Sequence, residues 1–302
     1  MSNTKIEWAT KVWNPVTGCT KVSDGCKYCY AERQWPRLAG NKKTLYHGRN
    51  FTDVECHEQL LQQPFKWKSP ERIFVNSMSD LFHDAVPDNF IKKVLNVVDG
   101  NPRHTFIVLT KRPERTQEFF ANFYDFRPGS DLTLRKNLWL GVSVEDQKTA
   151  DERIPVLLET PAAKRIISYE PALGPVNFEK FLVPPSPKGA EGASSLDWII
   201  AGGESGPKAR PSHPQWFRDV RDQCAKANVP FFFKQWGEWA PQDDWNKGRD
   251  DYWKITKHGA VPRYRSHLLN EKDGAVDFVG KKKAGHLLDG KEYFQFPEGG
   301  AQ

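Results

Sequence analysis

The feature that most constrains the fold is a repeated alternation of short apolar runs and helix-prone stretches. The apolar runs are rich in Val, Ile, Leu and Phe, and lie at residues 12–18, 72–77, 105–110, 137–144, 164–169, 196–201 and 229–233. The helix-prone stretches lie at residues 30–35, 88–98, 115–122, 149–158 and 213–227. Continuous apolar runs are typical of strands buried on both faces. Strands that alternate with helices indicate βαβ units and a parallel sheet.

Six or seven such units predict an α/β chain that forms a partial or complete parallel β/α barrel, TIM-like, over residues 1–236. A doubly wound open sheet stays the alternative, because strand order cannot be read from the sequence. The alternation stops at Gly237, and we expect residues 237–302 to pack across the barrel as a C-terminal capping segment. Residues 182–195, rich in Pro, Gly and Ser, are expected to form a surface loop.

Three of the five cysteines, Cys19, Cys26 and Cys29, lie between the first predicted strand and the first predicted helix with the spacing C-x6-C-x2-C. Three thiolates from one loop can hold a soft metal or three corners of an iron–sulfur cube. A closed zinc site would need a fourth ligand, such as a histidine, Cys56 or Cys224. We favour a [4Fe–4S] cluster with one iron left for another ligand. A zinc site and unmetallated thiols stay open as alternatives.

Composition limits the partners and the compartment. The net charge of +6 and the eleven tryptophans suit an anionic cofactor or a nucleic acid. The chain has no run of eighteen apolar residues and its first residues do not resemble a signal peptide, so we expect a cytoplasmic protein without a membrane span. In a reducing compartment, cysteines are more often metal ligands than disulfides.

Polar residues follow the predicted strands at their carboxyl ends, where barrel enzymes keep their active sites. Lys111 and Arg112 stand just before a predicted helix, where positive charge opposes the helix dipole, so we expect them to pair with a carboxylate or a phosphate. Ser143 and Glu145 follow the next strand, and a carboxylate there is suited to accept hydrogen bonds from ribose hydroxyls.

The later strands end in a second group of candidates. Gly202 and Gly203 permit close backbone approach to a ligand, and Glu204 beside them is expected to contact substrate or cofactor. For Trp236 the alternatives are stacking on a base and a place in the core. The other candidate substrate contacts are basic or amide side chains: Arg210, Lys234, Gln235, Lys281 and Lys282.

The Cys26-Lys27-Tyr28-Cys29 ending is similar to the cluster loop of radical S-adenosylmethionine enzymes, which usually have three residues between the first two cysteines where this chain has six. The full length resembles the phage and prophage "three-Cys-motif" family, a domain of unknown function. The motifs that carry this resemblance lie at residues 13–19, 78–83, 109–113, 141–145, 202–206, 232–237 and 285–290.

These resemblances imply a radical enzyme that uses a [4Fe–4S] cluster and S-adenosylmethionine to generate a 5′-deoxyadenosyl radical. They imply that Ser77, Ser79 and Asp80 bind the methionine amine, with Glu170 as a further cofactor contact. A nucleic acid or nucleotide is the expected substrate. An electron donor and a separately encoded three-Cys-motif protein are the expected partners. The alternatives are a non-catalytic, zinc-stabilised nucleic-acid-binding protein and a relative that keeps the barrel without the reaction.

Overall fold

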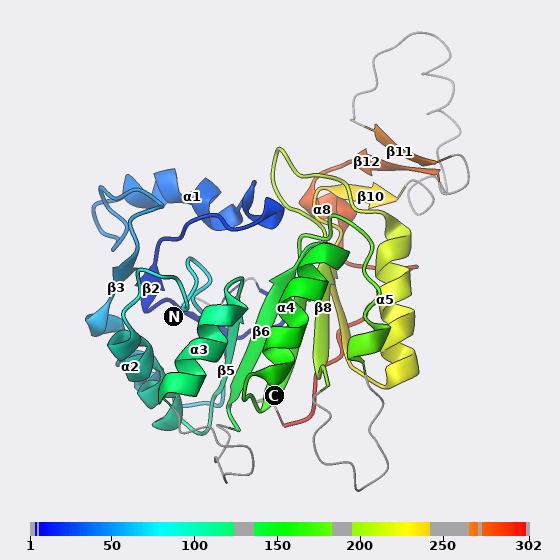
Figure 1. Ribbon diagram of the computed structural model, residues 1–302. Helices are drawn as coiled ribbons and strands as arrows, with labels where there is room; N and C mark the ends of the chain where they lie inside the picture. Colours follow the sequence, from blue (N-terminus) through cyan, green and yellow to red (C-terminus); the bar gives the residue numbers. More distant parts are fainter. Residues whose placement is uncertain are drawn as a thin grey trace, which may run out of the picture.

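The computed structural model describes residue 4 and residues 6–123, 136–182, 195–241, 266–270 and 274–299. Its centre is a seven-stranded parallel sheet in the order β1-β4-β5-β6-β7-β8-β9 (Figure 1). The strands are β1 (Lys11–Trp13), β4 (Arg72–Val75), β5 (Thr105–Thr110), β6 (Leu138–Val144), β7 (Lys164–Tyr169), β8 (Trp198–Gly202) and β9 (Phe231–Gln235).

The spatial order of these strands follows their order along the chain, so every crossover proceeds in the same direction. The helices therefore gather on the outer face of the sheet, as Figure 1 shows. They are α2 (Asp88–Asp99), α3 (Pro113–Phe123), α4 (Gln147–Glu159) and α5 (Pro214–Ala227). The predicted α/β half-barrel is confirmed. A doubly wound sheet would reverse its strand order and is excluded.

Side chains alternate between the two faces of the sheet. On β6, Leu140 and Val142 join the core under the helices, whereas Trp139 points to the inner face. Trp139, Trp198 and Phe232 form an aromatic layer on that inner face, closed by Trp8 from the N-terminal segment. Farther along β6, β7 and β9 the inner positions are polar, at Ser143, Ser168 and Lys234, and these three residues line a cavity at the carboxyl ends.

The predicted strand at residues 12–18 is wrong in one respect, because it is divided in two. β1 belongs to the parallel sheet, whereas β2 (Val16–Thr17) pairs with β3 (Glu55–Cys56) in a separate two-stranded sheet. Pro15 stands between β1 and β2, and proline has no N–H to donate to a ladder. The cysteine loop follows β2 through η1 (Asp24–Cys26) and leads into α1 (Tyr30–Ala39). The remaining single-turn helices are η2 (Glu58–Leu60), η3 (Pro64–Lys66) and η4 (Glu179–Phe181).

The C-terminal region contributes a three-stranded antiparallel sheet of β10 (Trp239–Pro241), β12 (Gly274–Phe278) and β11 (Ser266–Asn270), followed by α8 (Lys281–Ala284). In Figure 1 this sheet and α1 lie at the same end of the molecule. The chain then returns along β9, where Phe294 stacks on Phe232. A domain boundary at residue 236 stays a prediction, and most of the predicted loop at 182–195 lies outside the described residues. No described helix is long and apolar enough to cross a membrane.

Candidate active site

A cavity of about 500 Å³ lies at the carboxyl end of the sheet, beneath the cysteine loop. Its size is in the range of pockets that hold small molecules and cofactors. The predicted site residues that line it are Cys19, Cys26, Cys29, Ser77, Ser79, Asp80, Lys111, Arg112, Ser143, Glu170, Gly203, Glu204, Lys234, Gln235 and Lys281. Residues that are distant in the sequence thus meet around one space.

The three loop cysteines lie on one wall of this cavity as free thiols. Burial raises the pKa of Cys19 to about 11; nearby Asp80 adds to the rise, while Arg112 opposes it. The described residues include no group of three or more His, Cys, Asp or Glu side chains close enough together to hold a single metal ion. A four-iron cluster takes each thiolate on a different iron, so its ligands stand farther apart than those of one ion.

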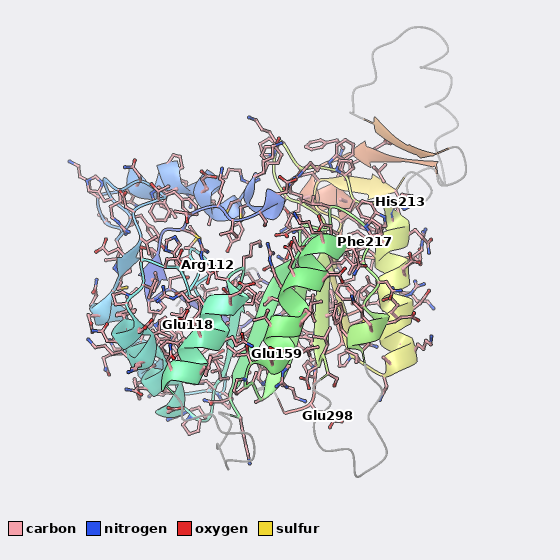
Figure 2. The ribbon with its side chains drawn as sticks, in the orientation of Figure 1. Arg112, Glu118, Glu159, His213, Phe217 and Glu298 are labelled. Carbon is pink, nitrogen blue, oxygen red and sulfur yellow. The ribbon has the colours of Figure 1, made fainter. Side chains whose placement is uncertain are left out.

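Asp80 connects the end of β5 to the cysteine loop. Its buried carboxylate accepts hydrogen bonds from Thr110 Oγ1, from the Lys111 backbone N–H and from Arg112 Nη1, the last at 3.2 Å. Arg112 Nη2 donates to the Thr20 carbonyl and hydroxyl oxygens, at 3.2 and 3.0 Å. Figure 2 shows Arg112 between the start of α3 and the N-terminal segment. Both side chains are thus engaged within the protein, although they were predicted as ligand contacts.

Glu145 does not line the cavity, contrary to the predicted ribose contact. Its carboxylate is 1% exposed and lies under the loop. It accepts a hydrogen bond from Ser23 Oγ at 2.8 Å, and pairs with Arg153 at 3.1 Å. A Cβ atom on Gly25 would approach Glu145 Oε1 to 2.3 Å, so only glycine allows this contact. Glu145 therefore supports the loop from below.

Glu204 holds the opposite end of the loop. Arg210 donates to its carboxylate from Nε and Nη2, at 2.9 and 2.6 Å, and from its backbone N–H. The same Nη2 donates to the Asp24 carbonyl at 2.9 Å, and the guanidinium lies over the Tyr28 ring. Arg210 thus holds the loop in place. It is not among the cavity residues, so its position gives no evidence for the predicted substrate contact.

A further charged pair lies on the inner face, between β9 and the residue that follows β7. Lys234 Nζ lies 2.8 Å from both carboxylate oxygens of Glu170. Gln235 Nε2 donates to Ser205 Oγ at 2.9 Å and to the Gly203 carbonyl at 3.3 Å. Glu170 follows β7, Gly203 and Ser205 follow β8, and Lys234 and Gln235 are the last two residues of β9. All five residues line the cavity.

Three further predicted contacts lie away from the cavity lining: Gly202, Trp236 and Lys282. Trp236 is a core residue that packs on Phe217 and Phe233, and its indole N–H donates to the Leu287 carbonyl. Trp236 is therefore not available for stacking on a base.

Several lining residues were not predicted, among them Trp8, Phe74, Asn76, Leu109 and Ser168. The period-two alternation of the strands could have identified Phe74, Leu109 and Ser168, because they lie on the inward side of their strands. No sequence signal places Trp8 there, since it reaches the cavity from outside the sheet.

The fold and the cavity define a class: a half-barrel of parallel βα units with a three-cysteine loop over the carboxyl ends of its strands. The chain belongs to the family DUF5131, described as a protein of unknown function, whose model matches residues 3–297. An association of this chain with phage stays a prediction. No curated protein matches the chain.

Among solved structures the chain is similar to spore photoproduct lyase. A complex of that enzyme with dinucleoside spore photoproduct aligns with a TM-score of 0.44 and 12% identity, over 94% of this chain and 72% of that one. A doubly substituted mutant of the enzyme, with bound AdoMet and dinucleoside spore photoproduct, aligns with a TM-score of 0.46 and 11% identity, over the same shares.

Proposed function

We propose that this protein is a radical S-adenosylmethionine-type enzyme that acts on a nucleic acid or a nucleotide. The observation that carries the proposal is the position of the cysteines. Three thiols from one short loop form a wall of a cofactor-sized cavity, at the end of a β/α half-barrel where such folds place their active sites. Cys19, Cys26 and Cys29 would each bind one iron of a [4Fe–4S] cluster and leave the fourth iron for S-adenosylmethionine.

A [4Fe–4S] cluster held by these cysteines would supply the electron for reductive cleavage of S-adenosylmethionine, and with it the means to take a hydrogen atom from the substrate. The protein orients the reactants and excludes water. Arg112, Glu145 and Arg210 hold the loop that carries the cysteines, through bonds to Thr20, Ser23 and Asp24.

Two serines are suited to the methionine ammonium group. Ser77 Oγ donates its hydrogen to Asn14 Oδ1, and Ser79 Oγ donates to the Val16 carbonyl. Their oxygen lone pairs remain as acceptors on the cavity wall, and an ammonium offers three donors. Asp80, although it lines the cavity, is occupied by Arg112 and β5.

The nucleic-acid part of the proposal rests on charge. The net charge is +6, and Lys281 lines the cavity at its outer side, where it can meet a phosphate. The electron donor and a separately encoded three-Cys-motif partner belong to the same proposal. The zinc alternative lacks support among the described residues, because no three candidate ligands meet at a single-ion distance.

Anaerobic reconstitution with iron and sulfide tests the enzyme. We expect a brown protein with about four irons and four sulfides per chain, and release of 5′-deoxyadenosine after reduction with dithionite in the presence of S-adenosylmethionine. Cys26→Ala should abolish that release. Cys56→Ala is the matched control, because Cys56 lies on β3 and does not line the cavity, and it should retain full release.

Each alternative has its own result in this experiment. A purified protein that contains one zinc and accepts no cluster would refute the proposal. A fully loaded and reduced cluster that leaves S-adenosylmethionine intact would identify an inactive relative.

A further inference from the structure

We propose that α1 and the residues that flank it bind the sugar–phosphate backbone of a nucleic-acid strand, which makes the substrate a polymer and not a free nucleotide. This inference rests on the proposed function, because it names the substrate class of the same site. The surface consists of five exposed cations along one segment, and we call it the basic face: Lys27, Arg33, Arg37, Lys42 and Lys43.

The positive charge of the protein is concentrated in the segment that contains the basic face. Residues 19–50 contain seven Lys and Arg and only two Asp and Glu, so this segment has a net charge of +5, whereas the whole chain has +6. The rest of the chain is therefore close to neutral. Positive charge gathered on one element is typical of a surface that binds a polyanion.

Two of the seven cations in this segment are neutralised within the protein. Lys21 pairs with Glu32 at 2.8 Å, and Arg49 pairs with Glu55 at 2.9 Å. The five cations of the basic face have no carboxylate partner among the described residues. Arg33 uses one of its N–H donors, from Nη1 to the Ser205 carbonyl at 2.7 Å, and this bond leaves its charge uncompensated.

Three further carboxylates lie near the basic face. Asp24 belongs to the same segment, and Asp53 accepts the Asn50 backbone N–H at 2.7 Å. Glu238 accepts the backbone N–H groups of Gly206 and Lys281, at 2.8 and 2.9 Å. Three carboxylates stand against five cations on the basic face and two more on α8, so the surface stays positive.

α1 presents part of the basic face to solvent on the side opposite its apolar contacts. Ala31 and Trp35 are 3% exposed and pack with Met78, whereas Arg33 and Arg37 are exposed. These two arginines are four residues apart, and like charges at that spacing destabilise a helix. An anion bound beside both would remove that cost.

The lysines on the outer face of the half-barrel show the ordinary pattern of a solvated surface. Each has a carboxylate partner, in the pairs Lys148–Glu152, Lys180–Asp151 and Lys226–Glu179. The basic face differs from that pattern, because its cations lack such partners among the described residues.

The length of the basic face indicates a polymer. α1 has 10 residues and is therefore about 15 Å long. Lys27 precedes this helix, and Lys42 and Lys43 follow it. One phosphate is too small to meet cations spread over that distance, whereas a strand presents a phosphate at every nucleotide.

The basic face leads to the cavity. Arg33 and Gln34 of α1 line the cavity, and so does Lys281 of α8, with exposed Lys282 beside it. Figure 1 shows α1 and α8 at the same end of the molecule. A strand that lies along the basic face therefore reaches the cavity mouth, where one nucleotide can leave the stack and enter, as in enzymes that act on single bases.

Fluorescence anisotropy with the full-length, reconstituted protein tests the surface. The probes are a DNA strand and an RNA strand of the same sequence, about 15 nucleotides long, with thymidine monophosphate as a competitor. We expect at least one strand to bind, with an affinity that falls as salt rises, and thymidine monophosphate to bind at least tenfold more weakly. The strand that binds more tightly identifies the polymer.

The test variant is Arg37→Gln/Lys42→Gln/Lys43→Gln, because these exposed residues of the basic face do not line the cavity. We expect it to weaken strand binding at least tenfold at about 0.1 M salt, and to reduce the slope of log K against log salt by about 2. The matched control, Lys148→Gln/Lys180→Gln/Lys226→Gln, removes the same charge from the outer face and should change the affinity by less than about twofold.

Four results would overturn the proposal: no binding of either strand, an unchanged salt slope in the test variant, equal losses in the two variants, or thymidine monophosphate that binds as tightly as a strand. Binding confined to phosphatidylserine vesicles would assign the basic face to a membrane and would also overturn it. Iron content and 5′-deoxyadenosine release test the enzyme separately. A protein that binds the strand and loads no cluster would refute only the enzyme, whereas an active protein that binds no strand would refute only the basic face.

Discussion

At the scale of single residues, three strand-end carboxylates share one task. Asp80, Glu145 and Glu204 follow β4, β6 and β8, and each pairs with an arginine: Arg112, Arg153 and Arg210. Each pair also contacts the cysteine loop, at Thr20, Ser23 and Asp24. Residues that sequence reasoning assigned to ligand binding therefore position the loop that would bind the ligand.

The Asp80–Arg112 pair predicts a large stability effect. Both side chains are less than 10% exposed, so Asp80→Asn leaves the Arg112 charge buried without a counter-ion. We expect the free energy of unfolding to fall by about 3 kcal/mol, measured by urea denaturation. Glu152→Gln is the control, because its pair with Lys148 is exposed and should contribute less than about 0.5 kcal/mol. Equal effects of the two substitutions would contradict the role of Asp80.

At the scale of elements, the cysteine loop depends on close packing over the end of β6. Gly25→Ala would place a methyl group 2.3 Å from Glu145 Oε1, so the loop must move away from the sheet. We expect iron incorporation to fall by more than half, while the circular dichroism of the barrel is retained. Gly40→Ala, at the end of α1, would place its methyl group 3.3 Å from the nearest atom, the Pro36 carbonyl oxygen. This variant should load iron normally. Normal loading of Gly25→Ala would show that the loop does not need this contact.

The elements themselves were largely predictable from the sequence. β5 and β7 begin and end at the predicted residues, because short, continuous apolar runs are typical of buried strands. The predicted first strand is interrupted at Pro15, because proline has no N–H to donate to a ladder, whatever the apolar pattern around it. Trp8 was not predictable, because it reaches the cavity through contacts with strands far along the chain.

The sequence predicted which residues lie near the site better than it predicted what each side chain does there. Strand-end spacing brought Cys19, Ser79, Lys111, Glu170 and Lys234 to one cavity. The same spacing could not distinguish a residue that faces the cavity from one that turns under the loop, as Glu145 does. That distinction depends on side-chain partners from other strands, which a single sequence does not reveal.

At the scale of the whole molecule, buried histidines link stability to pH. Burial is the main cause that lowers the pKa of His57, His83 and His104 below the ordinary value. The unfolded chain binds protons near pH 6.5 while the folded chain resists them, so stability is fully present above that pH and is lost as the pH falls. We expect the free energy of unfolding to decrease between pH 7.5 and 5.5, by up to about 1.4 kcal/mol per pH unit for each histidine.

Urea denaturation across that range measures the slope. His104→Gln should reduce it, whereas His47→Gln, at an exposed position, should leave it unchanged. A free energy of unfolding that does not change with pH in the wild-type protein would contradict the role given to the buried histidines.

The hydrogen bonds that join residues 20–29 to the sheet all involve a side chain, in the part of the chain that the structure describes. The barrel strands, in contrast, are joined by continuous backbone ladders. We therefore expect the loop to open at a lower free-energy cost than the barrel strands, which hydrogen exchange of the backbone amides of residues 20–29 would measure. Anything bound by its cysteines contributes its binding free energy to closing the loop, so occupancy and local order are thermodynamically coupled.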